Sequence, residues 1–461
     1  MKLSNRFLLA ACVPLVLSAC ATTAPPSQVV APVPTSWQAP LPHQGSLQGL
    51  SDWWSQLDDP LLVELIEAAQ GVSPGIAQAR SRIEQARAAQ ATARSALLPA
   101  VDGQANASRG FNEQVAAIAT TAQAGLQASW EIDLFGGNAA AQSAANQRLA
   151  GAEALWHEAR VSVAAEVAQQ TSSLRTCLEQ LRVAERDAQS RAETSRLSDL
   201  SERAGFTAPA TAALARASAA EAQARVSQQR MQCDVELKAL VALTGLEEPA
   251  LRTRLAASPA RPAPDALFTV DVLPAQVLAQ RPDVYSAERD VAAASADVGS
   301  AQAQRYPRLA LSGSIGTAWV RTGGATTDLN TWTLGPLALS VPLFDGGRRA
   351  AQVDAAQARY DEAVALYRAR VRQAVSEVEQ ALVRLQSTAE RNTSARAAAA
   401  GYRTSFDATE ARWRGGLASL VELEDARRTS LAAENAVIAL QHERQAAWVA
   451  LYRAAGGGWK P

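Results

Sequence analysis

The chain has 461 residues, and its 44 Lys and Arg side chains against 45 Asp and Glu give a formal net charge of −1 at pH 7. Without a basic bias, nucleic acid is not an expected partner. Aromatic residues make up 5% of the chain, and Ala, Gln, Arg and Glu recur in long periodic segments. This composition indicates closely packed long helices rather than a thick globular core.

The N-terminus has the pattern of an export signal. Lys2 and Arg6 precede an apolar stretch at 7–17 that is too short to span a bilayer. The stretch ends in Leu-Ser-Ala-Cys at 17–20, which resembles a bacterial lipobox. We expect residues 1–19 to be a signal peptide and Cys20 to carry a lipid anchor; plain secretion with cleavage elsewhere is the alternative. Residues 20–50 contain six prolines and no periodicity, which predicts a lipidated extended tether.

After the tether, one order of elements occurs twice, about 210 residues apart. Each half predicts a helix, two strands, a long helix, a turn and a second long helix. The pattern Leu-Phe-Gly-Gly at 134–137 recurs as Leu-Phe-Asp-Gly-Gly at 343–347, and Leu98-Pro99 recurs as Tyr306-Pro307. Gly205 and Gly415 each interrupt a helical stretch. We assign the first repeat to 51–248, a linker or equatorial segment to 249–275, and the second repeat to 276–461.

The long helices are predicted at about 146–204, 208–243, 349–414 and 417–454. Nearly sixty helical residues would form a rod of roughly 90 Å, which is longer than a compact domain. The second half carries a regular coiled-coil seam, formed by Val371, Val375, Val378, Leu382 and Leu385. A purely structural rod would show the same periodicity.

Four segments alternate apolar and polar side chains with the period of a strand, at 101–108, 126–134, 309–319 and 337–343. Such segments with Trp near their ends are typical of transmembrane strands, although each alone also fits a soluble sheet. No apolar run of about 18 residues follows the signal, so a membrane crossing would require strands in a closed barrel. Because a barrel needs about eight strands, four strands per chain predict an oligomer.

Two cysteines, Cys177 and Cys233, follow Cys20 in the mature chain. An exported protein folds where disulfides form, and the two lie at similar distances on either side of a turn near Thr207. A bridge between them is feasible if their Cα atoms come within about 7 Å. Two buried free thiols are the alternative.

An enzyme is not expected. The three histidines are scattered, and no His, Cys or carboxylate cluster has the spacing of a metal site. Paired acids such as Glu422 and Glu424 diverge on a helix, and no Gly-rich phosphate loop follows a strand. We therefore expect no metal and no cofactor.

Taken together, these motifs resemble the TolC-type outer-membrane efflux proteins, specifically the lipoprotein branch of NodT/OprM-like outer membrane factors. The resemblance covers about 50–459. The residues that carry it are the lipobox, Trp53-Trp54, Asp59-Pro60-Leu61, the run 130–136, Arg281-Pro282-Asp283-Val284, Tyr306-Pro307, the run 341–348 and Gly456-Gly457-Gly458-Trp459.

The resemblance implies an α+β membrane protein. Three copies would form a trimeric 12-stranded β-barrel, with four strands per protomer, continued by a long α-helical coiled-coil tunnel through the periplasm. The implied location is the bacterial outer membrane. The implied function is the channel of a tripartite efflux system that exports small molecules such as drugs or other toxic compounds. The implied partners are a periplasmic adaptor (membrane fusion) protein and an inner-membrane efflux pump. The alternative is a structural, periplasm-spanning coiled-coil lipoprotein without channel activity.

By motif position, the resemblance also implies a periplasmic gate at Val421, Asp425 and Arg428, and adaptor-facing hairpin turns at Gly205, Gly415 and Gly416. Three copies of Asp425 around a threefold axis would repel one another unless each were paired with Arg428 or Arg427 of a neighbouring helix. The alternative is an i, i+3 pair of Asp425 with Arg428 on one exposed helix.

Overall fold

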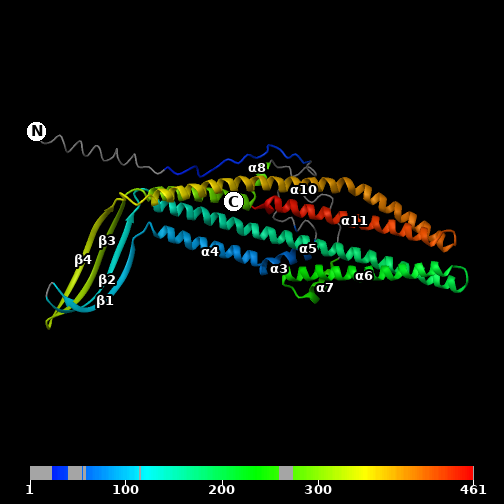
Figure 1. Cartoon of the computed structure of the whole chain (residues 1–461), viewed down its shortest axis with the longest axis horizontal. Helices are drawn as coiled ribbons and strands as arrows, with labels where there is room; N and C mark the ends of the chain where they lie inside the picture. The colour runs from blue at the N-terminus through cyan, green and yellow to red at the C-terminus, as the bar shows by residue number, and fades with distance from the viewer. Residues whose placement is uncertain (1–22, 40–53, 55–58, 114–115, 259–273, 460–461) are drawn as a thin grey trace. The chain divides into compact units, whose positions relative to one another are not determined.

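The computed structural model describes residues 23–39, 54, 59–113, 116–258 and 274–459 (Figure 1). The expected signal peptide and Cys20 lie outside these residues. The chain divides into two compact units. Unit 1 comprises Met1–Ala31, Ala79–Leu155 and Tyr285–Arg370, and unit 2 comprises Pro32–Gln78, Trp156–Val284 and Val371–Pro461. Each unit therefore draws segments from both sequence repeats.

The duplication is visible in the lengths of the helices. Helices α4 (Pro74–Ser95) and α9 (Pro282–Ala303) have 22 residues each, and α5 (Gly137–Arg203) and α10 (Arg348–Arg414) have 67 each. Helix α6 (Pro209–Thr244) has 36 residues and α11 (Leu420–Ala454) has 35. Helix α5 begins nine residues before the predicted start. The Asp133 carboxylate accepts the backbone N–H of Ala139 at 2.7 Å and satisfies a free donor of the first turn.

Unit 1 contains one antiparallel sheet, in the order β1 (Ala100–Asn112), β2 (Ala117–Ile132), β3 (Arg308–Thr322) and β4 (Ala325–Ser340). The strands β1 and β4 form its edges (Figure 1). The predicted ends of two strands were wrong, because β2 stops at Ile132 and β4 at Ser340, before Leu134 and Leu343. After β2, the Leu134 N–H turns back to the Ile132 carbonyl at 2.9 Å. After β4, Pro342 has no N–H to donate to a ladder.

The described part of the tether packs along the helices of unit 1. Its backbone carbonyls accept hydrogen bonds from Ser295 of α9, to Pro25 at 2.5 Å, and from Tyr360 of α10, to Pro26 at 2.9 Å. Next to this segment, side chains of α9 and α10 form an apolar cluster of Val291, Ala294, Val298, Ala356 and Tyr360. In unit 2, the Glu379 carboxylate accepts two further tether N–H groups, at 2.6 and 2.7 Å.

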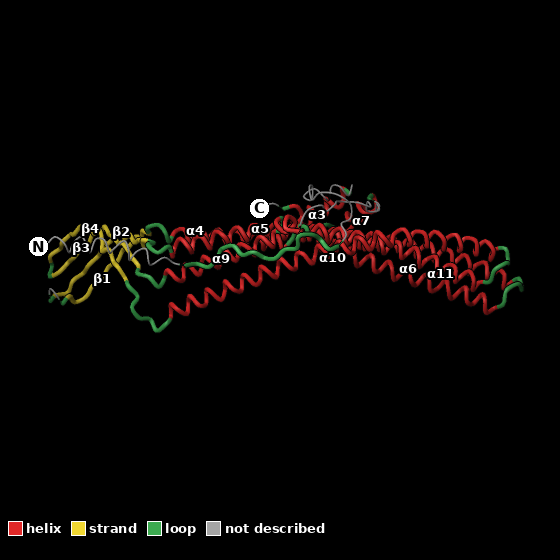
Figure 2. The backbone as a smooth tube through the Cα atoms, turned by 90° about the horizontal axis from the view of Figure 1, so that it is seen from above, coloured by secondary structure: helices red, strands yellow, loops and turns green. Residues whose placement is uncertain are grey.

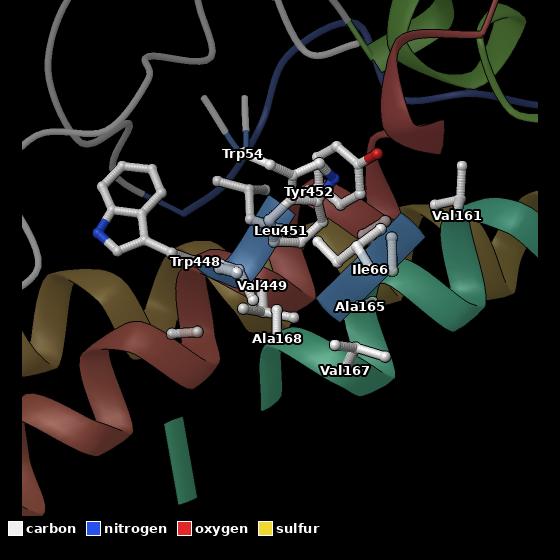
Figure 3. Close-up of a cluster of buried hydrophobic side chains, with 14 of the residues drawn as sticks. Trp54, Ile66, Val161, Ala165, Val167, Ala168, Trp448, Val449, Leu451 and Tyr452 are labelled. Atoms are coloured by element: carbon white, nitrogen blue, oxygen red, sulfur yellow. The ribbon is translucent and has the colours of Figure 1, made fainter. Parts of the chain in front are cut away.

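Unit 2 holds two helical hairpins, α5/α6 and α10/α11, which lie side by side in both views (Figures 1 and 2). The predicted seam of α10 is buried at Val371, Val378, Leu382 and Leu385, and Val375 is half-buried. Short helices cover the hairpins, among them α3 (Pro60–Val72), α7 (Glu248–Ala257) and α8 (Pro274–Ala279). In the core, Trp54 meets Tyr452 edge-on with ring centroids 4.6 Å apart (Figure 3).

Two of the sequence motifs form polar contacts that hold unit 2 together. Asp59 caps α3 by accepting the Leu62 N–H at 3.2 Å and also binds Arg175 of α5, which explains the Asp-Pro-Leu pattern. Buried Arg281 is bound to Asp283 by two hydrogen bonds of 3.0 and 2.7 Å. The same guanidinium donates to the carbonyl of Ala454 in the last turn of α11 at 2.9 Å, so the residue just before α9 is bound to the end of α11 within unit 2.

The C-terminal glycines follow as the short helix η2 (Gly456–Gly458). Gly456 has φ +80°, and a Cβ on it would lie 2.2 Å from the Gln280 carbonyl oxygen. Only glycine fits this position. Among the described residues, no helix is both long enough and apolar enough to cross a membrane.

Candidate functional site

The two hairpins end in turns of the same geometry. In the first turn, the N–H groups of Gly205 and Phe206 donate to the carbonyls of Glu202 and Ser201, each at 2.9 Å. In the second turn, the N–H groups of Gly416 and Leu417 donate to the carbonyls of Trp413 and Arg412, at 3.0 and 2.8 Å. This double hydrogen bond around a left-handed glycine ends many helices. It places Phe206 (87% exposed) and Leu417 (73% exposed) at matching positions of the two tips.

The structure corrects one pairing made from the sequence. Gly205 has φ +80°, and its counterpart in the second turn is Gly416 with φ +72°. Gly415, which we had matched with Gly205, has no positive φ. A Cβ on it would make only ordinary contacts, at 3.6 Å, with backbone oxygens. The required glycine is therefore one residue later than the spacing suggested.

The predicted gate residues lie together on the first turns of α11. Val421 is exposed, and Asp425 accepts a hydrogen bond from Arg428 at 3.0 Å while both side chains remain largely exposed. Within one chain this is the i, i+3 pair that we considered as the alternative. Helix α11 starts with a capping box, in which Glu422 receives the Ser419 N–H at 2.7 Å and Ser419 receives the Glu422 N–H at 3.1 Å. The Ser419 N–H holds the pKa of Glu422 below its usual range.

Arg427, considered from the sequence as a second partner for Asp425, is committed elsewhere. Its side chain is 2% exposed and is ion-paired to Glu424 at 2.5 Å. It also donates to Ser190 and Thr194 of α5, at 3.1 and 3.0 Å. Burial lowers the pKa of Arg427, and Glu424 opposes that shift. Arg427 therefore joins α11 to α5 inside the protomer and is not available at the surface.

A second buried arginine, Arg191, joins Arg427 and Glu424 in one cluster of paired charges. Arg191 of α5 binds Asp187 of its own helix at 2.8 Å, Ser218 of α6 at 2.5 Å, and Glu424 of α11. Buried charges are stable only when they are paired and hydrogen-bonded in this way. A cavity of about 780 Å³, lined by α5, α6 and α11, extends from the cluster to Asp425 and Arg428. Sequence reasoning missed the cluster, because the i, i+4 spacing of Asp187 and Arg191 is equally typical of an exposed face.

The first hairpin is covalently closed. Cys177 of α5 and Cys233 of α6 form a disulfide with a Cα–Cα distance of 5.4 Å. Among the described residues, no group of three or more His, Cys, Asp and Glu side chains is arranged to hold a metal ion.

Comparison with known proteins gives concordant results. A family model described as "Outer membrane efflux protein" matches residues 65–246 and 273–457. The chain is 31% identical to the outer membrane protein OprJ of Pseudomonas aeruginosa, over 96% of this chain and 94% of that protein. It is 30% identical to the pyoverdine export outer membrane protein OpmQ of Pseudomonas putida, over 97% and 96%.

Among solved structures, the outer-membrane channel OprN superposes with a TM-score of 0.84 at 27% identity. The match covers 96% of this chain and 100% of that one. The resemblance inferred from the motifs is confirmed. The predicted fold class is confirmed as well, since the protomer combines long helices with one four-stranded sheet as those channels do.

Proposed function

Because the chain belongs to the outer membrane efflux protein family, we propose that three copies of it assemble into the outer-membrane channel of a tripartite exporter. The protein is an efflux channel of the bacterial outer membrane that extends into the periplasm. Its partners in the proposal are a periplasmic adaptor and an inner-membrane pump. Relatives named for pyoverdine export, toluene efflux and cation efflux cover most of this chain. The channel therefore leaves the choice of compound to the pump.

The observation that carries the assembly is the open sheet. The four strands pair only in the order β1-β2-β3-β4 among the described residues, so each protomer has two unpaired edges. An exposed edge presents a row of free N–H and C=O groups, which cannot face lipid. Three copies joined edge to edge would give a closed sheet of twelve strands.

The faces of β4 support a membrane position for that sheet. Its large apolar side chains are exposed in the single protomer, at Trp332, Leu334, Leu337 and Leu339. Polar Thr331 and Thr333 alternate with Trp332 and Leu334. Exposed apolar side chains alternating with polar ones match a wall with lipid outside and water inside. Purified protein should therefore produce ion-conducting events in planar bilayers, whereas a sealed coiled-coil rod would produce none.

For the gate, we propose that three copies of the Asp425–Arg428 pair line the aperture at the tip. Both side chains are exposed in the protomer and border the same cavity, so they are free to meet other copies. Pairing of Asp425 with Arg428 across protomers would hold the tip closed, and Val421 would add an apolar ring. Asp425→Ala combined with Arg428→Ala should then raise resting conductance and leave trimers intact. Wild-type conductance from intact trimers would place the gate elsewhere.

For the adaptor, we propose docking at the two hairpin tips. Phe206 and Leu417 project from turns of equal geometry, so a trimer would present six exposed apolar side chains in similar positions. Phe206→Ser with Leu417→Ser should abolish cross-linking to the adaptor and efflux in cells, while single-channel conductance stays normal. Unchanged cross-linking would exclude the tips as the docking site.

For the lipid anchor, we propose acylation of Cys20, which lies outside the described residues. Cys20→Ser should abolish metabolic labelling with palmitate, while the protein stays in the outer-membrane fraction because the closed sheet anchors it more firmly than acyl chains. Equal labelling of both proteins would contradict the assignment.

A further inference from the structure

Two arginines lie on the apolar face of the sheet, and we propose that they bind a phosphate-bearing lipid of the outer leaflet of the outer membrane. Arg109 of β1 and Arg321 of β3 would hold the anionic head group from the lipid-facing side of the sheet. This inference rests on the membrane position proposed above for the sheet. It adds the kind of lipid that the sheet contacts and the residues that bind it.

The register of the strands brings the two arginines into one row across the sheet. Arg109 lies opposite Thr120 of β2, and Thr120 lies opposite Arg321. Arg321 in turn lies opposite Thr326 of β4. Directly opposed residues of an antiparallel pair point to the same face, so the row presents two guanidinium groups and two hydroxyl groups together. One strand separates the two arginines, which puts their Cα atoms about 10 Å apart.

The face that carries this row is the apolar one. Alternation along the strands places Arg109 on the side of Val101, and it places Arg321 on the side of Ile315 and Trp319. These apolar side chains are exposed in the protomer. The opposite face carries polar pairs that are hydrogen-bonded between strands at 2.9, 2.8 and 2.8 Å, namely Gln104 with Gln127, Ser108 with Thr121, and Ser314 with Thr333. In the proposed membrane position, the arginines therefore face lipid and not the polar interior.

The row lies near the end of the sheet that faces the exterior. Helices α4 and α9 lead into β1 and β3, and β2 and β4 lead back into α5 and α10, so these helices join the sheet at one end (Figure 1). The turns between paired strands lie at the other end. Arg109 is three residues before the end of β1, and Arg321 is the next to last residue of β3. Because the channel extends into the periplasm, the end with the turns points outward.

The length of β3 puts Arg321 at the level of the lipid head groups. Arg321 follows Leu309, near the start of the strand, by twelve residues. At a rise of about 3.4 Å per residue and a tilt of about 40°, this is about 31 Å across the membrane. The apolar band of a transmembrane sheet is about 25 Å tall and is bordered by aromatic side chains, and Trp319 lies two residues before Arg321. Arginine on the lipid face is destabilising at the bilayer midplane and nearly neutral at this depth.

The donors of the row are available to a ligand. Both arginine side chains are exposed, and neither forms an ion pair within the part of the chain that the structure describes. Two acids lie near the row but off it: Glu113 follows the end of β1, and Asp328 lies opposite Trp319. A guanidinium is a rigid fork of N–H donors that matches phosphate in a bidentate way. Two such forks with a hydroxyl group between them fit an anionic head group that carries phosphate.

The apolar side chains beside the row favour a lipid over a soluble phosphate. Trp319 and Ile315 continue from Arg321 toward the middle of the membrane on the same face, and both are exposed in the protomer. A lipid would place its phosphate on the row and its acyl chains along these side chains. A soluble phosphate compound would use only the row. The partner is therefore an anionic lipid, and at this end of the sheet it belongs to the outer leaflet.

The proposal can be tested by native mass spectrometry of the full-length protein in detergent, titrated with diphosphoryl lipid A. Arg109→Gln with Arg321→Gln should weaken binding roughly 30-fold, since each arginine near an anionic lipid surface contributes about fivefold. Arg109→Lys with Arg321→Lys should bind with intermediate affinity, because lysine keeps the charge and loses the fork. The control is Arg384→Gln with Arg396→Gln, which removes the same charge from exposed positions of α10 in unit 2 and should bind like the wild type.

Two further measurements separate the possible outcomes. Inorganic pyrophosphate should not displace the lipid at an equal concentration, and displacement would make the row a site for soluble phosphate. Equal losses for the two glutamine pairs would show attraction by net charge alone and refute the site. Conductance in planar bilayers tests the membrane position separately. If the Arg109 and Arg321 glutamine pair conducts normally and binds the lipid like the wild type, the row is wrong and the proposed channel stands. If wild-type protein does not conduct, the membrane position fails together with this inference.

Discussion

Replacing Glu158 by Gln should make the protein more stable above pH 7 and leave its stability unchanged near pH 4.5. Glu158 lies on α5 in unit 2 and is half-buried. Burial raises the pKa of its carboxyl group from 4.5 to about 7. Burial is the largest cause of this rise; the carboxylates of Asp283 and Glu377 contribute to it, and the guanidinium groups of Arg281 and Arg453 oppose it. Three acids thus face two cations in this part of the molecule.

The direction of the effect follows from proton linkage. Between pH 4.5 and about 7, the folded protein holds a proton on Glu158 that the unfolded chain has lost, so stability falls as pH rises through this window. Above about pH 7 the folded state bears the whole cost of a charged, half-buried carboxylate. The shift from 4.5 to about 7 corresponds to about 3 kcal/mol at most, since one pKa unit equals about 1.4 kcal/mol. Solvent screening reduces this figure.

The measurement is thermal unfolding of the full chain in detergent at pH 4.5 and pH 8.5. Glu158→Gln should raise the melting temperature by a few degrees at pH 8.5 and by nothing at pH 4.5. The control is Glu166→Gln, because Glu166 lies on the same helix and is exposed, so its replacement should change neither value. A variant that melts at or below the wild type at pH 8.5, or that gains equally at both pH values, would refute the reasoning.

Three further predictions concern packing and cross-links in unit 2. Gly456→Ala should prevent stable folding because its Cβ would lie 2.2 Å from a carbonyl oxygen, whereas Gly401→Ala, which meets open space, should fold normally in the same melting assay. Cys177→Ser should cost about 4 kcal/mol at most, since the disulfide closes a loop of 56 residues; reducing agent should lower the melting temperature of the wild type and not of the variant. Arg427→Met should destabilise by about 1.5–3 kcal/mol because it removes one of the two arginines paired with half-buried Glu424 and the hydrogen bonds to Ser190 and Thr194. Exposed Arg428→Met should stay near the wild-type melting temperature, and equal losses for the two variants would contradict the burial of Arg427.

Much of the architecture could be predicted because it is periodic. In a long helix or an alternating strand, many residues follow the same period, so a few exceptions do not obscure the pattern. Because of the duplication, each kind of element is predicted twice, once in each repeat, and the two members of each pair have nearly equal lengths. The residues at which single helices, strands and turns begin and end were predicted less accurately. The exact turn glycine, Gly416 rather than Gly415, depends on one φ angle that composition does not reveal.

The polar contacts were not predictable for a different reason. A proline-rich tether with no periodicity indicates an extended chain, but not that Ser295 and Tyr360 donate to its carbonyls. Arg427 and Arg428 are neighbours of the same type, yet one is buried and the other exposed. Burial depends on which face of α11 meets α5, and that is a property of the packed hairpins rather than of local sequence.

The two hairpins share a length and a turn, but they are held together differently. The disulfide joins α5 to α6 permanently, and at the level of Cys177 the second hairpin has Thr388, which bonds only within its own helix, to the Leu385 carbonyl. Helix α11 is tied to α5 by the charges of Arg191 and Arg427 instead. Separating α11 from the first hairpin would leave buried charges unpaired, at a cost of several kcal/mol. A partner that opens the tip must supply that difference by binding the open form more tightly. Motion of α11 as one body with the first hairpin avoids this cost, and in the proposed gate the exposed Asp425 and Arg428 would then be the contacts that change between copies.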